Sequence, residues 1–147
     1  MSHELPEPRC RPLNLAFVVD PLPGLKAYKD SSIAMMRAAA SRGHAVFAID
    51  CATLGWRRPE SAQPVGVFGV AVQLHMQPDN HDWFREIGRD RIPLSDFDAV
   101  IMRRDPPFDN EYLTATWLLE RAEAAGVRVF NRPRALRDHS EKVAIAE

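Results

Sequence analysis

Short runs of consecutive apolar residues, each closed by a charged or amide residue, limit the possible folds of this chain more than any other feature. The first two runs are LNLAFVVD at residues 13–20 and AVFAID at residues 45–50. An apolar run without alternation is typical of a strand covered on both faces, as in a parallel sheet. Between the runs, Asp30 is suited to cap a helix and Gly43 to end it. The pattern predicts a β-α-β unit, which is right-handed in nearly all known proteins.

The second half of the chain repeats this order. DAVIMRR at residues 98–104 predicts a strand, and VRVFN at residues 127–131 predicts another. Asp109 is placed to cap the helical segment between them, in which Leu113 and Trp117 share a face. Strands that alternate with helices indicate an α/β protein with an open, mainly parallel sheet.

The middle of the chain is less regular and predicts an irregular β insert. Residues 55–64, GWRRPESAQP, are typical of a turn-rich excursion, and residues 65–76, VGVFGVAVQLHM, of an extended strand interrupted by glycine. HDWFREIG at residues 81–88 predicts a short helix that buries Trp83 and Ile87.

Composition excludes several classes of function. The chain has 147 residues, enough for one domain, and a formal net charge of −1, so no overall positive field attracts nucleic acid or an anionic membrane. No apolar run approaches the length of a membrane helix. Residues 1–12, rich in proline and charge, predict a flexible lead-in without the apolar core of a secretory signal. Cys10 and Cys51 show no disulfide or metal-ligand spacing, which favours reduced thiols in a cytoplasmic protein.

Polar residues follow the predicted strands at their carboxyl ends, where open α/β sheets bind their ligands. They are Asp20, Asp50, Arg103, Arg104, Asp105 and Asn131. Pro106 and Pro107 come directly after this charged segment, and each proline fixes φ near −65° and removes a backbone donor. The segment RRDPPFD therefore predicts a charged site held on a rigid loop.

Several motifs resemble one family in the order in which they occur. They are VVDP after the first strand, KDSS at the first helix, MRRDPPFD, and ATWLLERAEAAGVRVFNRPRALRDHSEK. From about Leu13 to Glu147 the chain resembles the N-terminal domain of bacterial glutathione synthetase, and RxDPPFD followed by NxPxxLRDxxEK carries most of the resemblance.

This resemblance implies a fold and an activity. The fold would be a Rossmann-like pre-ATP-grasp domain over residues 13–139, with helices on both faces of the sheet. Full-length members of the family join γ-glutamylcysteine to glycine with ATP and Mg²⁺, through an acyl-phosphate, and assemble into homodimers or homotetramers. Residues 140–147, which begin an amphipathic helix, would be the truncated start of the ATP-grasp domain.

In the family, later domains hold the nucleotide. The resemblance therefore implies that the 147-residue chain alone has no catalytic residues, binds no metal or ATP, and is inactive. Lys142 matches the first of the two nucleotide lysines of the family, and its role here would be latent.

Arg103 is the first candidate for substrate binding. A guanidinium has the planar donor geometry that holds a carboxylate and stabilises growing negative charge. The alternative is that Arg103 or Arg104 pairs with Asp105 or Asp98 and only braces the loop. Strand alternation sends Arg104 to the other face, which favours a structural role for it. Asp105 could orient Arg103 or accept from a substrate ammonium.

Four further candidates have an ordinary structural alternative. Asp20 is expected to face the same crevice as Arg103. Ser31 and Ser32 begin the first helix, whose free N–H groups favour an anion such as a carboxylate, although Asp and Ser are also common capping residues. Asn131 is expected at the same crevice, although it could simply close a turn before a proline.

Two other functions remain open on the residues alone. The first is the same domain of another ATP-grasp peptide or amino-acid ligase. The second is a free-standing α/β ligand-binding module, which would need a natural stop near Glu147.

Overall fold

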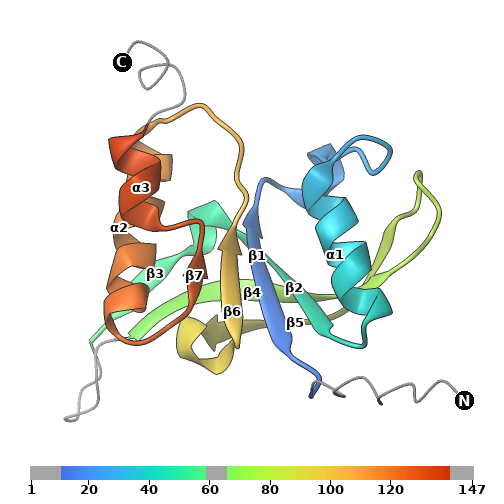
Figure 1. The fold of residues 1–147 in the computed structure, drawn as a ribbon, viewed down its shortest axis with the longest axis horizontal. Helices are drawn as coiled ribbons and strands as arrows, with labels where there is room; N and C mark the ends of the chain where they lie inside the picture. The colour runs from blue at the N-terminus through green and yellow to red at the C-terminus, as the bar shows by residue number, and fades with distance from the viewer. Residues whose placement is uncertain (1–10, 59–65, 140–147) are drawn as a thin grey trace, which may run out of the picture.

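Four parallel strands form the centre of the sheet in the computed structural model, which describes residues 11–58 and 66–139. In chain order they are β1 (Asn14–Val19), β2 (Ala45–Asp50), β6 (Ala99–Met102) and β7 (Val129–Phe130). β1 pairs in parallel with both β2 and β6, and β6 pairs in parallel with β7. Figure 1 shows β1 and β6 side by side in the middle of the molecule. The predicted α/β sheet is confirmed, and its Rossmann-like centre consists of these strands.

The irregular middle of the chain adds three antiparallel strands to this sheet. They are β3 (Gly55–Arg57), β4 (Gly66–Met76) and β5 (Phe84–Pro93). β4 pairs with β2, β3 and β5, so the seven described strands form one mixed sheet. The segment at 55–64 is thus not only a turn, because its first residues form β3.

The helix expected over residues 81–88 is wrong. Residues from Phe84 onward form β5, and although Trp83 is buried as predicted, Ile87 is 55% exposed. The apolar spacing in HDWFREIG is too short to distinguish a helix from a strand. Pairing with the long strand β4, a tertiary interaction, decides the outcome.

The two faces of the sheet are covered by different helices. α1 (Ser31–Ser41) packs with Phe17 and Val19 of β1 in one core cluster. α2 (Asn110–Ala124) packs with Ala16 and Val18 in the other. Alternate residues of one strand thus enter opposite cores, as expected for a strand buried on both faces. The two helices lie on opposite sides of β1 and β6 in Figure 1.

The helix ends follow the sequence signals. The carboxylate of Asp30 accepts from the amides of Ser32 and Ile33, and that of Asp109 accepts from the amide of Tyr112. Gly43 and Gly126, which follow the two helices, have φ of +84° and +101°, values that glycine adopts without strain. The predicted caps and stops are therefore confirmed.

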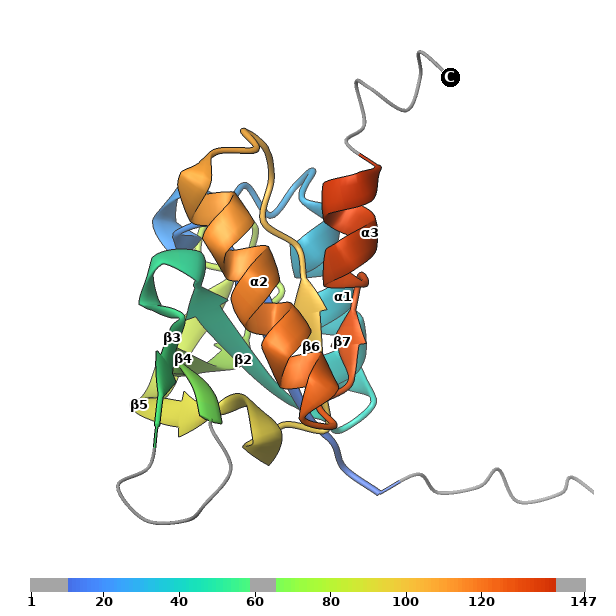
Figure 2. The same ribbon diagram turned by 90° about the vertical axis from the view of Figure 1, so that its left-hand side faces the viewer.

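The exposed side of α2 carries the two residues whose shared face was predicted. Trp117 is 55% exposed and Leu113 is half-buried, whereas Tyr112, Ala115 and Leu119 enter the core. A third helix, α3 (Pro133–Asp138), was not predicted and packs beside α2 (Figure 2), where Arg137 pairs with Glu120. The helix start expected near Ser140 lies outside the described residues.

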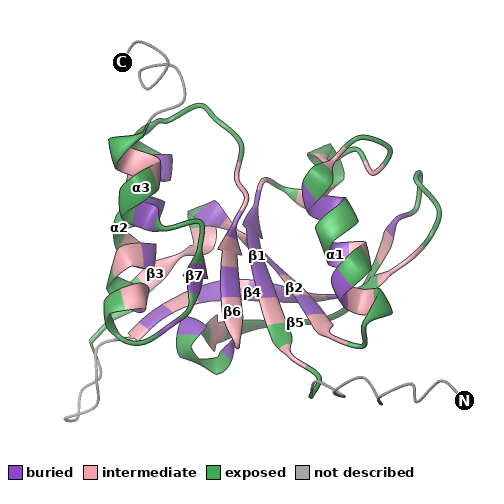
Figure 3. Cartoon of the chain, in the orientation of Figure 1, coloured by how far each residue is buried: buried purple, intermediate pink, exposed green. Residues whose placement is uncertain are grey.

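Three short 3-10 turns complete the described elements. They cover Leu22–Gly24, Cys51–Thr53 and Leu94–Asp96. Figure 3 shows that buried residues concentrate in the central strands and on the inner sides of the helices. Among the residues that the structure describes, no helix is long and apolar enough to cross a membrane.

Candidate functional site

A polar pocket of about 580 Å³ opens beyond the carboxyl ends of β1 and β6. The loop after β1, the start of α1 and the loop after β6 line it. Its charged and hydroxyl side chains are Asp20, Lys26, Lys29, Asp30, Ser31, Ser32, Arg103 and Asp105. The structure thus brings together Asp20, Arg103 and Asp105, as the strand-end argument predicts, with Ser31 and Ser32 from the start of α1.

Arg103 is oriented by two neutral hydroxyl groups. Its Nε donates to the Oγ of Ser32 at 3.1 Å, and its Nη2 donates to the Oγ of Ser31 at 2.5 Å. The backbone amide of Arg103 donates to the carbonyl of Val18 at 2.8 Å, which fixes the residue at the end of β6. Within the described ranges, no carboxylate lies within ion-pair distance of Arg103. The guanidinium is therefore held in place without a direct ion-pair partner among the described residues.

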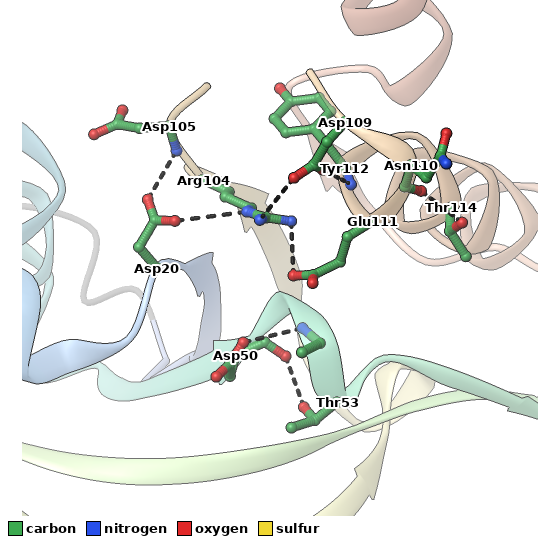
Figure 4. A network of polar contacts seen from close by, with 11 residues as sticks. Asp20, Asp50, Thr53, Arg104, Asp105, Asp109, Asn110, Glu111, Tyr112 and Thr114 are labelled. Carbon is green, nitrogen blue, oxygen red and sulfur yellow. Dashed lines mark hydrogen bonds and ion pairs between the residues drawn. The ribbon is translucent and has the colours of Figure 1, made fainter. Parts of the chain in front are cut away.

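Arg104 lies in an acidic environment. It pairs with Asp20 at 3.5 Å, Asp109 at 3.8 Å and Glu111 at 2.9 Å, and its side chain is only 12% exposed. Figure 4 shows the guanidinium between Asp20 on one side and the start of α2 on the other. Strand alternation accounts for the contrast with Arg103, because adjacent residues point to opposite faces. Arg104, and not Arg103, thus braces the loop through ion pairs. Its partners are Asp20, Asp109 and Glu111, and not the expected Asp105 or Asp98.

The loop between β6 and α2 is fixed at both of its ends. The carboxylate of Asp20 accepts from the backbone amide of Asp105 at 3.0 Å, and Asp109 caps α2. The peptide bond between Pro106 and Pro107 is cis. Asp20 thus connects the end of β1 to this loop, and its carboxylate is already engaged by protein donors.

Asp105 keeps its charge available. Its backbone amide is bound by Asp20, but no ion pair of its carboxylate occurs in the part of the chain that the structure describes. Asp105 and Arg103 therefore place an unpaired negative and an unpaired positive charge on the lining of one pocket.

Sequence reasoning missed the lysines of the pocket. Lys26 and Lys29 lie in the loop before α1 and line the pocket beside Arg103. The signal was present in KAYKDSS, where two lysines precede a helix start directly after a strand-end loop. A sequence shows neither the path of such a loop nor which lysine points inward.

One predicted residue is absent from the lining of the pocket, and another lies outside the described residues. Asn131 is not part of its lining, because its side-chain amide donates to the carbonyl of Met102 at 3.1 Å and so connects β7 to β6. Asn131 thus lies beside the end of β6, and its part in substrate binding stays a prediction. The peptide bond before Asn131 is cis. Lys142 lies outside the described residues.

A buried thiol lies behind the Arg104 network. Cys51 is 4% exposed, and burial raises the pKa of its thiol, while contact with Arg104 partly opposes that rise. An elevated pKa keeps a thiol protonated and unreactive, so this cysteine is part of the core.

The described residues offer no centre for a divalent cation. No group of three or more His, Cys, Asp or Glu side chains in them is arranged to hold a metal ion.

Comparisons with known proteins show which family this chain is similar to. Residues 13–137 match the family described as the N-terminal domain of prokaryotic glutathione synthetase. The glutathione synthetase of Ralstonia nicotianae is 50% identical over 135 residues, which cover 92% of this chain and 40% of that protein. That of Nitrosomonas europaea is 47% identical, with 92% and 41% covered, and that of Escherichia coli O157:H7 is 35% identical, with 91% and 41% covered.

The chain spans about two fifths of the length of these curated relatives. The family match covers both helical faces and every described strand of the sheet, from Leu13 to Arg137. The chain belongs to the family of prokaryotic glutathione synthetase N-terminal domains.

Proposed function

We propose that this chain is the substrate-binding domain of a glutathione synthetase and that its polar pocket holds γ-glutamylcysteine. The reaction would join this dipeptide to glycine with ATP and Mg²⁺, through an acyl-phosphate. The observation that carries the proposal is the guanidinium of Arg103, which two hydroxyls orient and no described carboxylate neutralises. A fixed, unpaired guanidinium is suited to bind the carboxylate of a substrate.

Other groups around Arg103 favour an anion at the same point. Ser31 and Ser32 occupy the first turn of α1, where Asp30 already caps the amides of Ser32 and Ile33, so the two serines contribute through the hydroxyls that orient Arg103. Lys26 and Lys29 add positive charge to the pocket lining. These groups come from two separate segments of the chain, so the fold, and not one local motif, creates the positive side of the pocket.

The negative side of the pocket suits an ammonium group. Asp105 lines the pocket without an ion-pair partner among the described residues, close in sequence to Arg103. The γ-glutamyl end of the dipeptide carries an α-carboxylate and an α-ammonium on one carbon atom. Arg103 would bind the carboxylate and Asp105 the ammonium. Glycine is also a zwitterion, but a pocket of about 580 Å³ exceeds what so small a molecule fills.

The remaining residues have indirect roles in this proposal. Asp20 holds the backbone of Asp105 and pairs with Arg104, so it shapes the pocket and does not bind substrate. Asn131 connects β7 to β6. Lys142 would bind nucleotide phosphates together with the ATP-grasp part of a longer chain. We further infer a cytoplasmic homodimer or homotetramer, and the protonated, core-buried thiol of Cys51 is consistent with a reducing compartment.

A titration of the 147-residue chain with γ-glutamylcysteine tests the proposal. Amide resonances of Ser31, Ser32 and Asp105 should shift in two-dimensional NMR spectra when the dipeptide binds. Arg103→Ala should raise the dissociation constant about tenfold or more. Arg42→Ala is the matched control, because Arg42 lies at the far end of α1 and is exposed. Shifts confined to another part of the sheet, or equal binding by both variants, would contradict the proposal.

A further inference from the structure

β5 forms a long free edge of the sheet. It pairs along its length with β4, while β2 and β3 occupy the opposite edge of that strand. Residues 85–91 of β5 are exposed on both faces, and Figure 3 shows the strand largely in the colour of exposed residues. No other strand among the described residues pairs with its outer edge. A strand of this length presents unpaired backbone groups to which another strand can add.

A β-bulge at Ile87 sets which side chains of β5 share a face. Gln73 of β4 lies opposite Gly88, and the next residue, Leu74, lies opposite Glu86, so Ile87 has no partner. The extra residue brings Glu86 and Arg89 onto one face, where the Nε of Arg89 donates to a carboxylate oxygen of Glu86 at 2.9 Å. In the same way, Arg85 and Asp90 come to share the other face.

The charges of this edge complement themselves. If two copies of β5 run antiparallel with Ile87 of each opposite Gly88 of the other, Glu86 faces Arg89 and Arg85 faces Asp90. Each contact occurs twice because of the twofold symmetry. Opposed residues of an antiparallel pair must share a face, and the bulge makes this true for both pairs.

Neighbouring registers lack this match. A shift by one residue opposes residues that lie on different faces of β5, and it also brings like charges together: Arg85 and Arg89 in one direction, Glu86 and Asp90 in the other. Like charges directly opposite each other destabilise a strand pair. A shift by two residues that places Glu86 opposite Arg91 keeps these opposite charges on one face, but it leaves Arg85 opposite Ile92 and Asp90 opposite Ile87. The register with Ile87 opposite Gly88 therefore pairs the most charges.

We propose that β5 is an interface at which a second copy of this chain pairs antiparallel, with Glu86 opposite Arg89 and Arg85 opposite Asp90 across a twofold axis. The two sheets then join into one continuous sheet. β4 and β2 separate β5 from β1, and the proposal does not depend on which substrate the polar pocket binds.

Complementary charge variants test this pairing in the 147-residue chain. Sedimentation equilibrium of the wild type should show a reversible dimer, weakened by salt because exposed charges are screened. Glu86→Arg and Arg89→Glu should each weaken the dimer about tenfold or more, because repulsion replaces attraction at symmetric positions. A mixture of the two variants should form a heterodimer, since the introduced arginine of one variant then faces the introduced glutamate of the other. The ion pair between residues 86 and 89 within one strand is absent from both variants, so association of the mixture reports contacts between the strands.

The controls separate register from general charge attraction. Arg42→Glu changes the net charge as Arg89→Glu does, but at an exposed site outside β5. This variant should dimerise like the wild type, and its mixture with Glu86→Arg should not form the heterodimer. Thermal unfolding of each variant verifies that the monomer is folded. A wild type that stays monomeric at submillimolar concentration would overturn the proposal, and so would a mixture that fails to associate.

Discussion

The adjacent residues Arg103 and Arg104 have the same chemistry and opposite surroundings. Arg104 is nearly buried and pairs with three carboxylates, whereas Arg103 lines the pocket and contacts two hydroxyls. A charge already surrounded by acids gains little from a ligand, but an oriented and unpaired charge can gain a full charge-assisted bond. The two arginines should therefore differ in what their loss changes.

Arg103→Ala should lower kcat/KM for γ-glutamylcysteine far more than Arg104→Ala, in a longer synthetase that carries this domain. In a closed site, loss of a charge-assisted bond costs roughly 2–4 kcal/mol, which corresponds to about 30- to 1000-fold in rate. Arg103→Lys should restore only part of the loss, because an ammonium lacks the planar donor geometry. Initial rates of phosphate release at varied dipeptide concentration measure these effects.

Arg104→Ala should mainly reduce stability. It leaves Asp20, Asp109 and Glu111 without their common partner, at a cost of roughly 1–3 kcal/mol, since these carboxylates are partly exposed. Urea unfolding of the two alanine variants measures this difference. If Arg103→Ala keeps normal dipeptide kinetics and only unfolds more easily, Arg103 is a brace and the binding assignment is wrong.

Local sequence signals predict the elements of the parallel sheet well. Apolar runs ending at Asp20 and Asp50, and caps at Asp30 and Asp109, depend on neighbouring residues and on backbone geometry. β5 could not be found in this way, because its residues are exposed and its strand conformation depends on β4. Where an element is stabilised by a distant partner, a local pattern carries little information.

The same division holds for the pocket. The rule that ligands bind at the carboxyl ends of parallel strands correctly brings Asp20, Arg103 and Asp105 together. It does not bring Asn131 into the lining of this pocket, since the side-chain amide of Asn131 donates to the carbonyl of Met102. It also omits Lys26, since the path of a loop is not encoded in strand periodicity.

Close packing between β4 and β2 makes a specific prediction at Gly69. A Cβ atom at this position would lie 2.7 Å from the Cγ2 of Ile49 and 3.4 Å from a methyl group of Leu54. Gly69→Ala should therefore destabilise the domain by roughly 1–3 kcal/mol through overpacking. Gly66→Ala, in the same strand, has open space around its Cβ and should be nearly neutral. Thermal or urea unfolding compares the two.

A double variant tests whether the cause at Gly69 is this contact. Combined with Ile49→Ala, the Gly69→Ala substitution should cost less than it does alone, because the clashing methyl group is gone. Additive effects of the two substitutions would instead indicate a cause in the backbone of β4.

In the molecule as a whole, two core clusters on opposite faces of one sheet are joined through β1. Alternate residues of this strand enter each cluster, so neither face can open without disturbing the other. The polar pocket lies at the end of the same strand, beside Asp20. Binding at the pocket should thus stabilise the whole domain and not one loop.

The 147-residue chain should unfold cooperatively, and it should bind γ-glutamylcysteine but not ATP. γ-Glutamylcysteine should raise the melting temperature with increasing concentration, because a ligand that binds only the folded state stabilises it by RT ln(1 + [L]/Kd). ATP with Mg²⁺ should leave the melting temperature nearly unchanged, since we propose that the nucleotide binds to the ATP-grasp part of a longer chain, and the curated relatives extend well beyond this chain. Calorimetric titration measures both affinities directly. A micromolar ATP site on this chain would show that its own residues bind nucleotide, and the division of substrate and nucleotide between separate domains would then be wrong.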